Sequence, residues 1–306
     1  MDLPEDFDPP TGTAEDLEPG LRRIVAPNPS PMTWRGTNTY LVGETGLAVI
    51  DPGPDDPGHQ QAILDAVGPG QHVSHILVTH AHLDHSPLAR GLAQATGAPV
   101  LAYGNARAGR SAVMEMLEVN GLAGGGEGVD AGFAPDIALA DGDTVQGDGW
   151  EIRALWTPGH FGNHLAFLWG DVGFSGDLVM GWASSLVSPP DGDLTDFMAS
   201  CDRLRAERLR ILHAGHGAPV TDPAARIDWL TGHRRGREAA ILAALAAGPA
   251  DAATLTRTIY TDTPAALLPA AERNVFAHLV DLVQKNRVSA KSALSARAVF
   301  ERVTPD

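Results

Sequence analysis

The pattern of hydrophobic and polar positions divides the chain into two parts. Up to about residue 221, short apolar runs rich in β-branched residues alternate with stretches of helical spacing, which is typical of an α/β fold. These runs predict strands near residues 39–50, 73–79, 98–102, 151–156, 164–176 and 209–213. Beyond residue 221 the apolar spacing is helical, so we expect a large domain over residues 21–221 and a small one over residues 222–306.

The C-terminal part predicts several helices and a hairpin. Helical spacing covers residues 227–230, 238–247, 252–259 and 270–283, and residues 288–303 suit a short hairpin, so this part resembles a winged-helix module. Three arginines, Arg234, Arg235 and Arg237, cluster near its start. They indicate either a nucleic-acid contact or the solvated basic edge of a packing module, and a regional charge of only +2 favours the packing module.

The densest chemical signal is the stretch His80-Ala81-His82-Leu83-Asp84-His85, which directly follows the apolar run of residues 73–79. In α/β proteins the end of a strand is where functional sites are usually built. Neutral imidazoles suit zinc and similar ions, and a carboxylate adds an oxygen ligand. Four such groups without an ion would repel one another or stay unsatisfied, so the stretch predicts a metal site. An ordinary histidine run or tag lacks the interposed Asp and the preceding strand.

Three further candidate ligands, His160, Asp177 and His216, each follow an apolar stretch and have a neighbouring glycine. His80 and His82 are two residues apart and do not share a helix face, so they converge on one ion only from an extended or loop segment. A helix should therefore begin after them, around residues 86–88, with Asp84 or Ser86 as its N-cap.

The His-x-His-x-Asp-His box, followed in order by a distant His, an Asp and a His, resembles the signature of the metallo-β-lactamase fold superfamily. The resemblance covers about residues 20–220 and implies an αββα sandwich. It also implies two metal ions, the first held by His80, His82 and His160, the second by Asp84, His85 and His216, with Asp177 bridging both. Residues 29–41 and 232–238 are similar to the β-lactamase-like protein 2 branch, whose animal members are endoribonucleases.

This resemblance implies a hydrolase with two zinc ions, or alternatively manganese or iron, in which Asp84 and Asp177 are catalytic and a metal-bridging hydroxide attacks the substrate. We expect a small ester, thioester or lactone. An endoribonuclease or phosphodiesterase stays open, as do a mono-iron oxygenase, a β-lactamase and a non-catalytic binding module. The complete second ligand set disfavours the mono-iron site, and Cys201, the single cysteine, lies in a predicted helix rather than near the motifs.

Charge and composition limit the classes of substrate and partner that we expect the protein to bind. The net charge is −16 at pH 7, and residues 1–221 hold 29 Asp and Glu against 11 Lys and Arg. Such a domain repels a phosphate backbone, so a small-molecule substrate is favoured over nucleic acid. Residues 1–20 are acidic, without Lys or Arg, which predicts a mobile tail rather than a secretory signal. No apolar run is long enough to span a bilayer, and we expect a cytoplasmic protein of undetermined oligomeric state.

Several residues around the motifs have two interpretations. Asp51 ends an apolar run before Pro-Gly, where it is either a turn residue or, as in the family, a support of the metal cluster. His164 and His213 either support the metal cluster or occupy ordinary positions at strand ends, and the ordinary positions are favoured. Residues 106–136 form either a lid or a surface loop. The pocket candidates are Trp182, Ser184 and Ser185, and the histidines without a predicted chemical role are His59, His72, His75, His233 and His278.

Overall fold

The structure, a computed structural model, describes residues 7–124 and 128–303. Its strands are β1 (Glu15–Glu18), β2 (Leu21–Val25), β3 (Asn38–Val42), β4 (Gly46–Ile50), β5 (His72–Leu77), β6 (Val100–Ala102), β7 (Ile137–Ala138), β8 (Thr144–Gln146), β9 (Glu151–Trp156), β10 (Leu165–Trp169), β11 (Val172–Gly176), β12 (Ile211–Ala214), β13 (Val288–Ala290) and β14 (Phe300–Arg302). Its helices are α1 (Pro57–Asp65), α2 (Leu88–Thr96), α3 (Ala112–Val119), α4 (Leu194–Ala206), α5 (Pro223–Ala246), α6 (Ala252–Ile259) and α7 (Leu268–Gln284), with a 3-10 turn at Ala265–Leu267.

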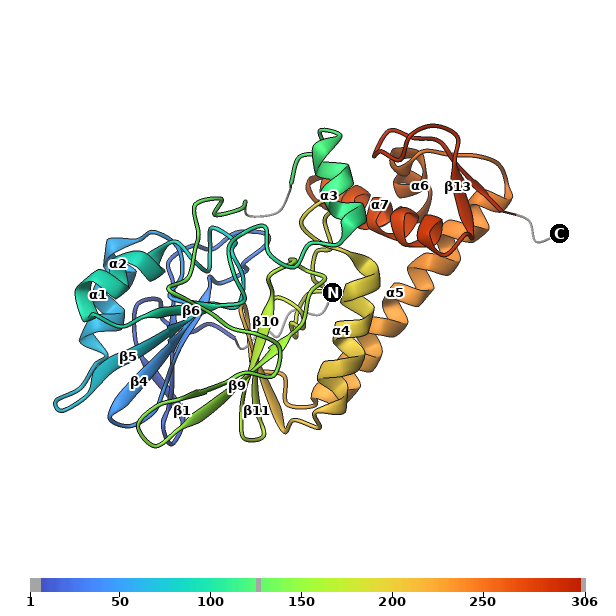
Figure 1. The fold of residues 1–306 in the computed structure, drawn as a ribbon. Helices are drawn as coiled ribbons and strands as arrows, with labels where there is room; N and C mark the ends of the chain where they lie inside the picture. Colours follow the sequence, from blue (N-terminus) through green and yellow to red (C-terminus); the bar gives the residue numbers. More distant parts are fainter. Residues whose placement is uncertain (1–6, 125–127, 304–306) are drawn as a thin grey trace.

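Two sheets lie face to face in the larger part of the molecule (Figure 1). The first runs in the order β1 to β7, and the second in the order β12-β11-β10-β9-β8. Apolar side chains of both inner faces, such as Tyr40 and Ile50 from the first sheet and Phe167 and Phe174 from the second, form one buried cluster. Burial between the sheets therefore accounts for every second residue of the apolar runs in β3, β4, β10 and β11.

Helices cover both outer faces of the sandwich. Ile63 of α1 and Leu92 of α2 pack against the outer side of the first sheet. Phe197 of α4 and Leu230 of α5 pack against the outer side of the second. The predicted αββα sandwich is thereby confirmed, and its layers are visible in Figure 1.

The C-terminal part is organised around one long helix. The prediction of two helices over residues 227–230 and 238–247 is wrong, because α5 is continuous across them. Its first half packs on the sandwich through Ile227, and its second half packs in the C-terminal core through Leu245. Burial at both ends outweighs the helix-weakening effect of the glycines between them. With α6, α7 and the antiparallel pair β13–β14, this part has the three helices and the hairpin of a winged-helix module.

The strands predicted from the sequence do not include two strands in a charged segment near the N-terminus. Residues 15–25 form β1 and β2 at the edge of the first sheet, although β1 has the sequence Glu-Asp-Leu-Glu. Residues 1–6 of the predicted tail lie outside the described residues, and the mobility of residues 1–20 stays a prediction. Of the helices in the described part of the chain, none combines the length and apolar composition that a membrane span requires.

Candidate metal centre

The candidate ligands come together because each follows the carboxyl end of a strand. The His80–His85 box follows β5, Asp177 follows β11, and His216 follows β12. His160 follows β9 in the loop that leads to β10. These ends meet at one edge of the sandwich, which is where α/β folds assemble their sites. The structure thus brings together all seven residues that the motif selected.

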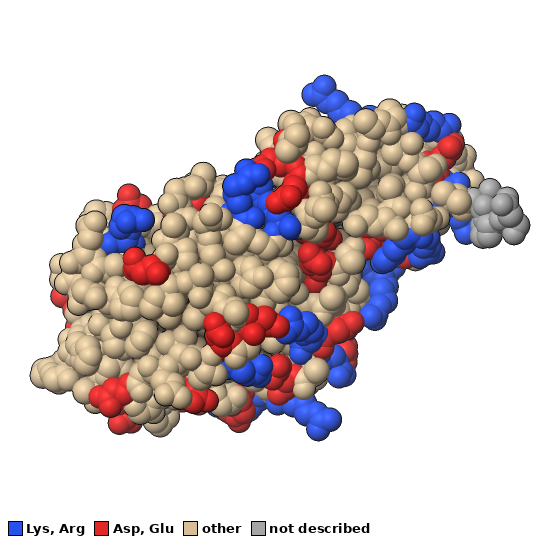
Figure 2. All heavy atoms as spheres, in the orientation of Figure 1, with Lys and Arg blue, Asp and Glu red and all other residues tan. Residues whose placement is uncertain are grey.

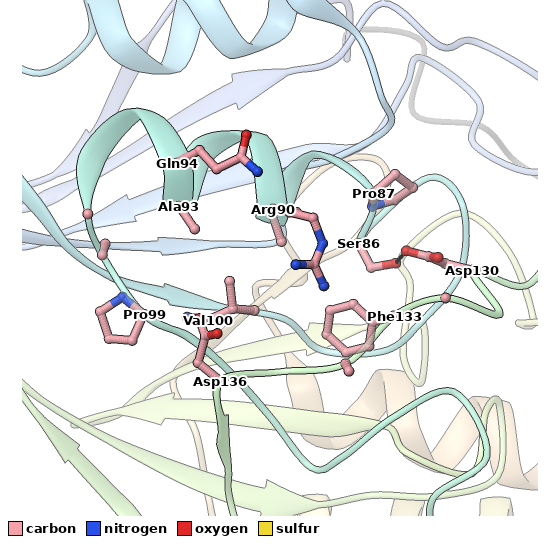
Figure 3. A pocket seen from close by; sticks show the side chains of 15 residues that line it. Ser86, Pro87, Arg90, Ala93, Gln94, Pro99, Val100, Asp130, Phe133 and Asp136 are labelled. Carbon is pink, nitrogen blue, oxygen red and sulfur yellow. Dashed lines mark hydrogen bonds between the residues drawn. The ribbon is translucent and has the colours of Figure 1, made fainter.

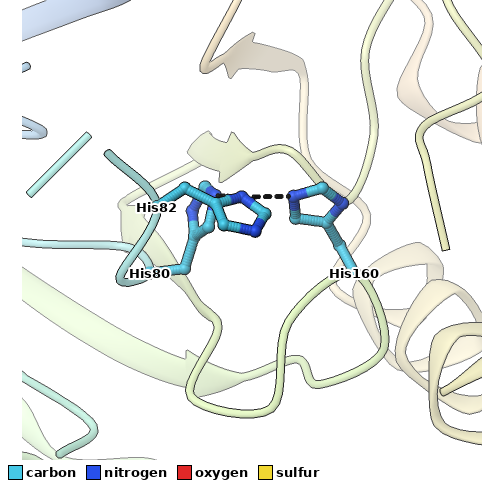
Figure 4. Close-up of side chains that lie close together, drawn as sticks. All are labelled: His80, His82 and His160. Atoms are coloured by element: carbon cyan, nitrogen blue, oxygen red, sulfur yellow. Dashed lines mark hydrogen bonds between the residues drawn. The ribbon is translucent and has the colours of Figure 1, made fainter. Parts of the chain in front are cut away.

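His80, His82 and His160 form the first group of the cluster (Figure 4). The Nε2 atom of His80 lies 2.9 Å from Nδ1 of His82. The Nε2 atom of His160 lies 3.1 Å from the same Nδ1 atom. All three side chains are buried. Three ring nitrogens therefore point at one another in the interior.

Asp84, His85, Asp177 and His216 form the second group. The Nε2 atoms of His85 and His216 are 3.2 Å apart, and Oδ2 of Asp84 lies 3.1 Å from Nε2 of His216. Asp177 reaches both groups, since its Oδ2 atom lies 3.3 Å from Nε2 of His216 and 3.7 Å from Nε2 of His160. Its carboxylate thus lies between the two groups.

The first group has the chemistry of a cation site. Burial lowers the pKa of His82 to about 3, and burial together with the neighbouring histidines holds the pKa of His80 well below its usual value. The rings are therefore neutral near pH 7. Nδ1 of His82 faces the Nε2 atoms of both His80 and His160 and carries at most one proton, so at most one of the two contacts is a well-formed hydrogen bond, whereas a shared divalent ion would take a lone pair from each ring.

The second group carries the negative charge. Burial alone would raise the pKa of Asp84, but His85 and His216 lower it to about 2. The same two histidines hold the pKa of Asp177 well below its usual value despite burial. Both carboxylates are thus ionised, and Oδ1 of each lacks a hydrogen-bond donor among the described residues. Buried, ionised oxygens without a donor suit metal ligands, so the donor set of both groups fits divalent ions.

Hydrogen bonds on the outer side of the rings fix which nitrogen faces the cluster. His160 donates from Nδ1 to the carbonyl of Leu186 at 2.7 Å, and His216 donates from Nδ1 to the carbonyl of Gly36 at 3.2 Å. Because a carbonyl only accepts, Nδ1 of each ring carries a proton and Nε2 faces the cluster. This arrangement is usual for histidines that bind metal. In His160 this Nε2 atom presents a lone pair, whereas in His216 burial is outweighed by the carboxylates of Asp177 and Asp84, which raise the pKa to about 10 and keep a proton that a bound cation would displace.

The position of Asp51 decides between its two interpretations. Its Oδ2 atom lies 2.9 Å from Nδ1 of His85, and Oδ1 accepts the backbone N–H of Thr79 at 2.7 Å. The hydroxyl of Thr79 donates to Oδ2 as well. Asp51 has a positive φ of 51°, a conformation that is uncommon outside glycine. It therefore supports the cluster instead of serving only as a turn residue.

His164 supports the cluster, which is the less favoured of its two interpretations from the sequence. Its Nε2 atom accepts the backbone N–H of Asp177 at 3.2 Å, and its Nδ1 atom lies 2.9 Å from the hydroxyl of Thr157. Burial holds its pKa well below the usual value, so it can accept. His213, in contrast, packs on Phe174 and has no hydrogen-bond partner among the described residues. It is the ordinary strand-end histidine that the pattern predicted.

The sequence interpretation missed Asn38 and Asn163. Asn38 donates from Nδ2 to the carbonyls of Ala214 and Gly217, which flank His216. Asn163 accepts the backbone N–H of Ala81 between the first two histidines at 3.3 Å. Both asparagines hydrogen-bond to backbone groups and not to the side chains of the candidate ligands. The spacing of the ligand motif in the sequence therefore does not indicate them.

The start of α2 differs from the prediction. Pro87 is the N-cap and makes no capping hydrogen bond from its side chain, so the assignment of Asp84 or Ser86 as the cap is wrong. Asp84 faces His216, and the hydroxyl of Ser86 bonds to the carbonyl of His82 and to Asp130. The carboxylate of Asp84 therefore lies in the cluster, and the hydroxyl of Ser86 holds the backbone of the His80–His85 stretch. Neither side chain caps the first amides of α2.

A small pocket of about 30 Å³ opens on the cluster. Besides five of the cluster residues, it is lined by Met32, Met180 and Leu186. The predicted pocket residues Trp182, Ser184 and Ser185 are not part of this lining. Trp182 packs on Trp34, with ring centroids 5.6 Å apart, and the serines turn their backbone toward α5.

A larger hollow of about 700 Å³ lies beside α2, and Figure 3 shows its lining. Arg90, Gln94, Phe133 and Asp136 contribute to it, and none of the seven cluster residues does. Ser86 and Asp130 form the part of its wall closest to the box. The larger hollow therefore lies outside the cluster.

Comparison with known proteins decides the family. A profile of the metallo-beta-lactamase superfamily matches residues 32–216, a range that contains all seven cluster residues. The chain belongs to the metallo-β-lactamase superfamily. A profile of the beta-lactamase associated winged helix domain matches residues 252–296, which confirms the C-terminal winged helix. This member of the superfamily is accordingly a metal-dependent hydrolase, with a His and Asp cluster that could hold two ions.

Individual relatives agree with this assignment. The beta-lactamase-like protein 2 homolog of Drosophila melanogaster is 29% identical over 286 residues, which cover 89% of this chain and 90% of the relative. The atrochrysone carboxyl ACP thioesterase of Aspergillus fumigatus is 28% identical over 304 residues, which cover 93% of this chain and 84% of the relative. The solved structure of a metallo-beta-lactamase family protein from Thermus thermophilus has a TM-score of 0.75 and 27% identity, covering 94% of this chain and 100% of that chain.

Proposed function

We propose that the protein is a binuclear zinc hydrolase that cleaves thioesters. The observation that carries the proposal is the place of Asp177, whose carboxylate lies within 3.7 Å of the ligand nitrogens of both groups. A carboxylate in this position can bridge two dications and reduce their repulsion. His80, His82 and His160 would hold one ion, and Asp84, His85 and His216 the other.

The seven side chains suit zinc in particular. Zinc takes imidazole nitrogens and carboxylate oxygens as ligands. When bound, a pair of such ions lowers the pKa of water and polarises an electrophilic oxygen. The complete second group argues against a single iron, which would leave Asp84, His85 and His216 without a partner.

The pocket supports a carbonyl substrate. Met32, Met180 and Leu186 line it beside the cluster, and no Lys or Arg belongs to its described lining. Sites that bind phosphate usually supply such cations. On the face in Figure 2, acidic and basic side chains lie interspersed over the sandwich. The apolar side chains beside the cluster suit contact with an acyl group, and a lining without Lys or Arg disfavours a nucleic-acid backbone.

The relatives favour a thioester among the carbonyl substrates. Matched fungal relatives carry the name atrochrysone carboxyl ACP thioesterase. In such a reaction, oxygen bonds to the carbonyl carbon, the C–S bond breaks and the sulfur leaves as a thiol. Asp84 would hold the second ion through Oδ2, which faces His216, and its ionised Oδ1 atom, which lacks a donor among the described residues, is left to accept a proton. We assign to Oδ1 of Asp84 the role of accepting the proton that the attacking water loses.

The proposal is tested by metal analysis combined with a substrate panel. Purified protein should contain two zinc ions per chain and hydrolyse acyl thioesters in preference to esters, lactones, β-lactams and short single-stranded RNA. A chelator should abolish turnover, and added zinc should restore it. One iron per chain would refute the binuclear zinc site. RNA cleavage without thioesterase activity would refute the substrate class and leave the metal site intact.

A further inference from the structure

The C-terminal helices contact the backbone beside the first group of ligands. Residues 184–187, called here the wall segment, include Leu186, which lines the pocket. The carbonyl of Leu186 accepts from Nδ1 of His160 at 2.7 Å. Whatever fixes the wall segment therefore fixes the orientation of the His160 ring.

Arg234 of α5 holds the first half of the wall segment. Its Nη2 atom donates to the carbonyls of Ser184 and Ser185, each at 2.6 Å. The side chain is only 2% exposed, and burial lowers its pKa to about 10, so it stays charged at neutral pH. Ser185 has a positive φ of 55°, a strained conformation for a residue other than glycine. Two charge-assisted hydrogen bonds from a buried guanidinium stabilise this backbone.

Asn274 of α7 holds the second half. Its Oδ1 atom accepts the backbone N–H of Val187 at 3.1 Å and also accepts from Nη1 of Arg234 at 2.8 Å. Leu186 thus lies between two residues whose backbones are bound by the C-terminal part. Helices α4, α5 and α7 contact one another at this point (Figure 1).

A second route leads from Arg234 to the residue before His160. The guanidinium lies over the ring of Phe197 in α4, 5.2 Å from its centroid. The backbone of Phe197 packs so closely on Gly159 that a Cβ added there would lie 2.2 Å from the Cα atom of Phe197. Arg234 therefore contacts both the residues that hold the acceptor of His160 and the helix that packs behind its backbone.

We propose that Arg234 and Asn274 are positioning residues, through which the winged-helix part of the chain sets the ring orientation of His160 and so the affinity of the first metal ion. The inference rests on the proposed metal site, since it takes His160 as a ligand. Arg234 and Asn274 would then act on the metal site in addition to holding the winged-helix part against the sandwich. Partners that orient a ligating histidine typically contribute about 10- to 100-fold in metal affinity.

The test measures zinc affinity by competition with a chromophoric chelator on the full-length protein freed of metal. Asn274→Leu has a similar volume but accepts no hydrogen bond, and should weaken binding of one of the two ions about 10- to 100-fold. Asn274→Asp keeps an acceptor oxygen for both Arg234 and Val187 and should retain the affinity of the unchanged protein. The matched control is Thr195→Val, which removes the 2.7 Å bond from Thr195 to Asp281 between α4 and α7 and leaves the wall segment alone. It should lower the melting temperature and keep both affinities.

A double-mutant cycle separates positioning from a merely structural role. In a His160→Ala background, Asn274→Leu should cause no further loss of affinity, because the ring that it orients is gone. An equal loss in both backgrounds would overturn the inference, as would unchanged zinc binding by Asn274→Leu alone. If the leucine variant does not fold, Asn274→Ala takes its place in the cycle.

The outcomes also separate this inference from the proposed function. Unchanged protein that binds two zinc ions without cleaving thioesters would refute the substrate class and leave the role of Asn274 intact. Two bound zinc ions together with an unaffected Asn274→Leu variant would refute the positioning role alone. Failure of the unchanged protein to bind metal would refute both.

Discussion

At the scale of single residues, the centre depends on one carboxylate that faces two groups of ligands. Asp177 is the only described side chain of the cluster for which contacts to both His160 and His216 are found. Its backbone is itself held by His164. Removal of this carboxylate would leave two cations without a shared anion between them.

We therefore expect Asp177→Ala to lower zinc content and activity together. The loss of several kcal/mol of charge stabilisation corresponds to a rate reduction of about 100-fold or more. Zinc per chain and turnover are measured on the same preparation. Asp171→Ala, which removes an exposed partner of Arg210 just before β11, is the control and should leave both unchanged. Two tightly bound zinc ions in Asp177→Ala would rule out a bridging role.

A second prediction at the scale of single residues concerns the effect of Asp51 on zinc affinity. Asp51→Asn replaces one oxygen that accepts from His85 or Thr79 with an amide N–H₂ group, so a donor would face a donor. We expect zinc affinity to fall about 10- to 100-fold, as for other partners of metal-bound histidines. Chelator competition measures this change.

The control for Asp51→Asn separates metal affinity from stability. Asp56→Ala removes the side chain that caps α1 through the N–H of His59. It should cost about 1 kcal/mol of unfolding free energy and leave zinc affinity unchanged. Equal zinc affinities of Asp51→Asn and the unchanged protein would show that Asp51 acts only as a turn residue.

At the scale of secondary-structure elements, replacing glycine by alanine should have opposite effects on stability at two positions, Gly159 and Gly236. Gly159 has a positive φ of 135° and lies against the backbone of α4, where a Cβ would be 2.2 Å from Phe197. Gly236 lies inside α5, and a Cβ there would meet nothing within 4 Å.

Gly159→Ala should therefore destabilise the fold by about 3 kcal/mol or more, through overpacking and backbone strain. Gly236→Ala should stabilise it by about 0.5–1 kcal/mol, because alanine loses less backbone entropy in a helix. Denaturant unfolding of the two variants measures both changes. Similar effects of the two substitutions would contradict the close packing of α4 on the His160 loop.

The sequence predicted most of the elements that surround the cluster, for physical reasons. Strands β4, β10 and β11 are almost fully buried, and β5 and β9 are buried at half of their residues, so their apolar positions can be recognised in the sequence. Strand β1 lies at the sheet edge, where charged side chains are tolerated, and its sequence Glu-Asp-Leu-Glu has no alternation of apolar and polar residues from which a strand could be predicted.

The candidate ligands were recognisable because chemistry restricts their residue types. The supporting residues were not, since Asn38, Leu186 and Asn274 act through backbone groups or through contacts that are distant in the sequence. The supporting role of His164 was the less favoured interpretation for the same reason, because its partner is the backbone amide of Asp177. Burial and contact distance reveal these roles, and neither can be derived from one sequence.

At the scale of the whole molecule, the two parts share one packed structure. Residues 112–119 of the sandwich part form α3, whose Met114 and Leu117 lie in the core of the winged-helix part. Arg273 of α7 donates to the carbonyls of Ala123 and Gly124, which follow α3. Residues 112–124 of the 106–136 insertion are thus held by the C-terminal part, while Val129 and Phe133 pack on the sandwich.

The same shared core should make stability sensitive to acid through His278 in α7. Its ring is buried, and neither nitrogen has a hydrogen-bond partner among the described residues. Burial, followed by the nearby basic groups of Arg234, His233, Lys285 and Arg237, lowers its pKa to about 3. Below about pH 6.5 the ring binds a proton in the unfolded chain but not in the folded chain. The contribution to stability is therefore complete at neutral pH and is lost as the pH falls from about 6.5 toward 3.

We expect this single ring to account for about 2 kcal/mol of the stability lost between pH 7 and pH 5. His278→Leu removes the titrating group without leaving a hydrogen bond unmade, so its unfolding free energy should fall less over that interval. The difference between the two proteins is measured by denaturant unfolding at both pH values in excess chelator, which removes any contribution from bound metal. His72→Gln changes an exposed histidine and should behave as the unchanged protein does. An identical acid dependence of His278→Leu and the unchanged protein would mean that the ring becomes solvated before the core opens, and that the winged-helix part unfolds separately from the sandwich.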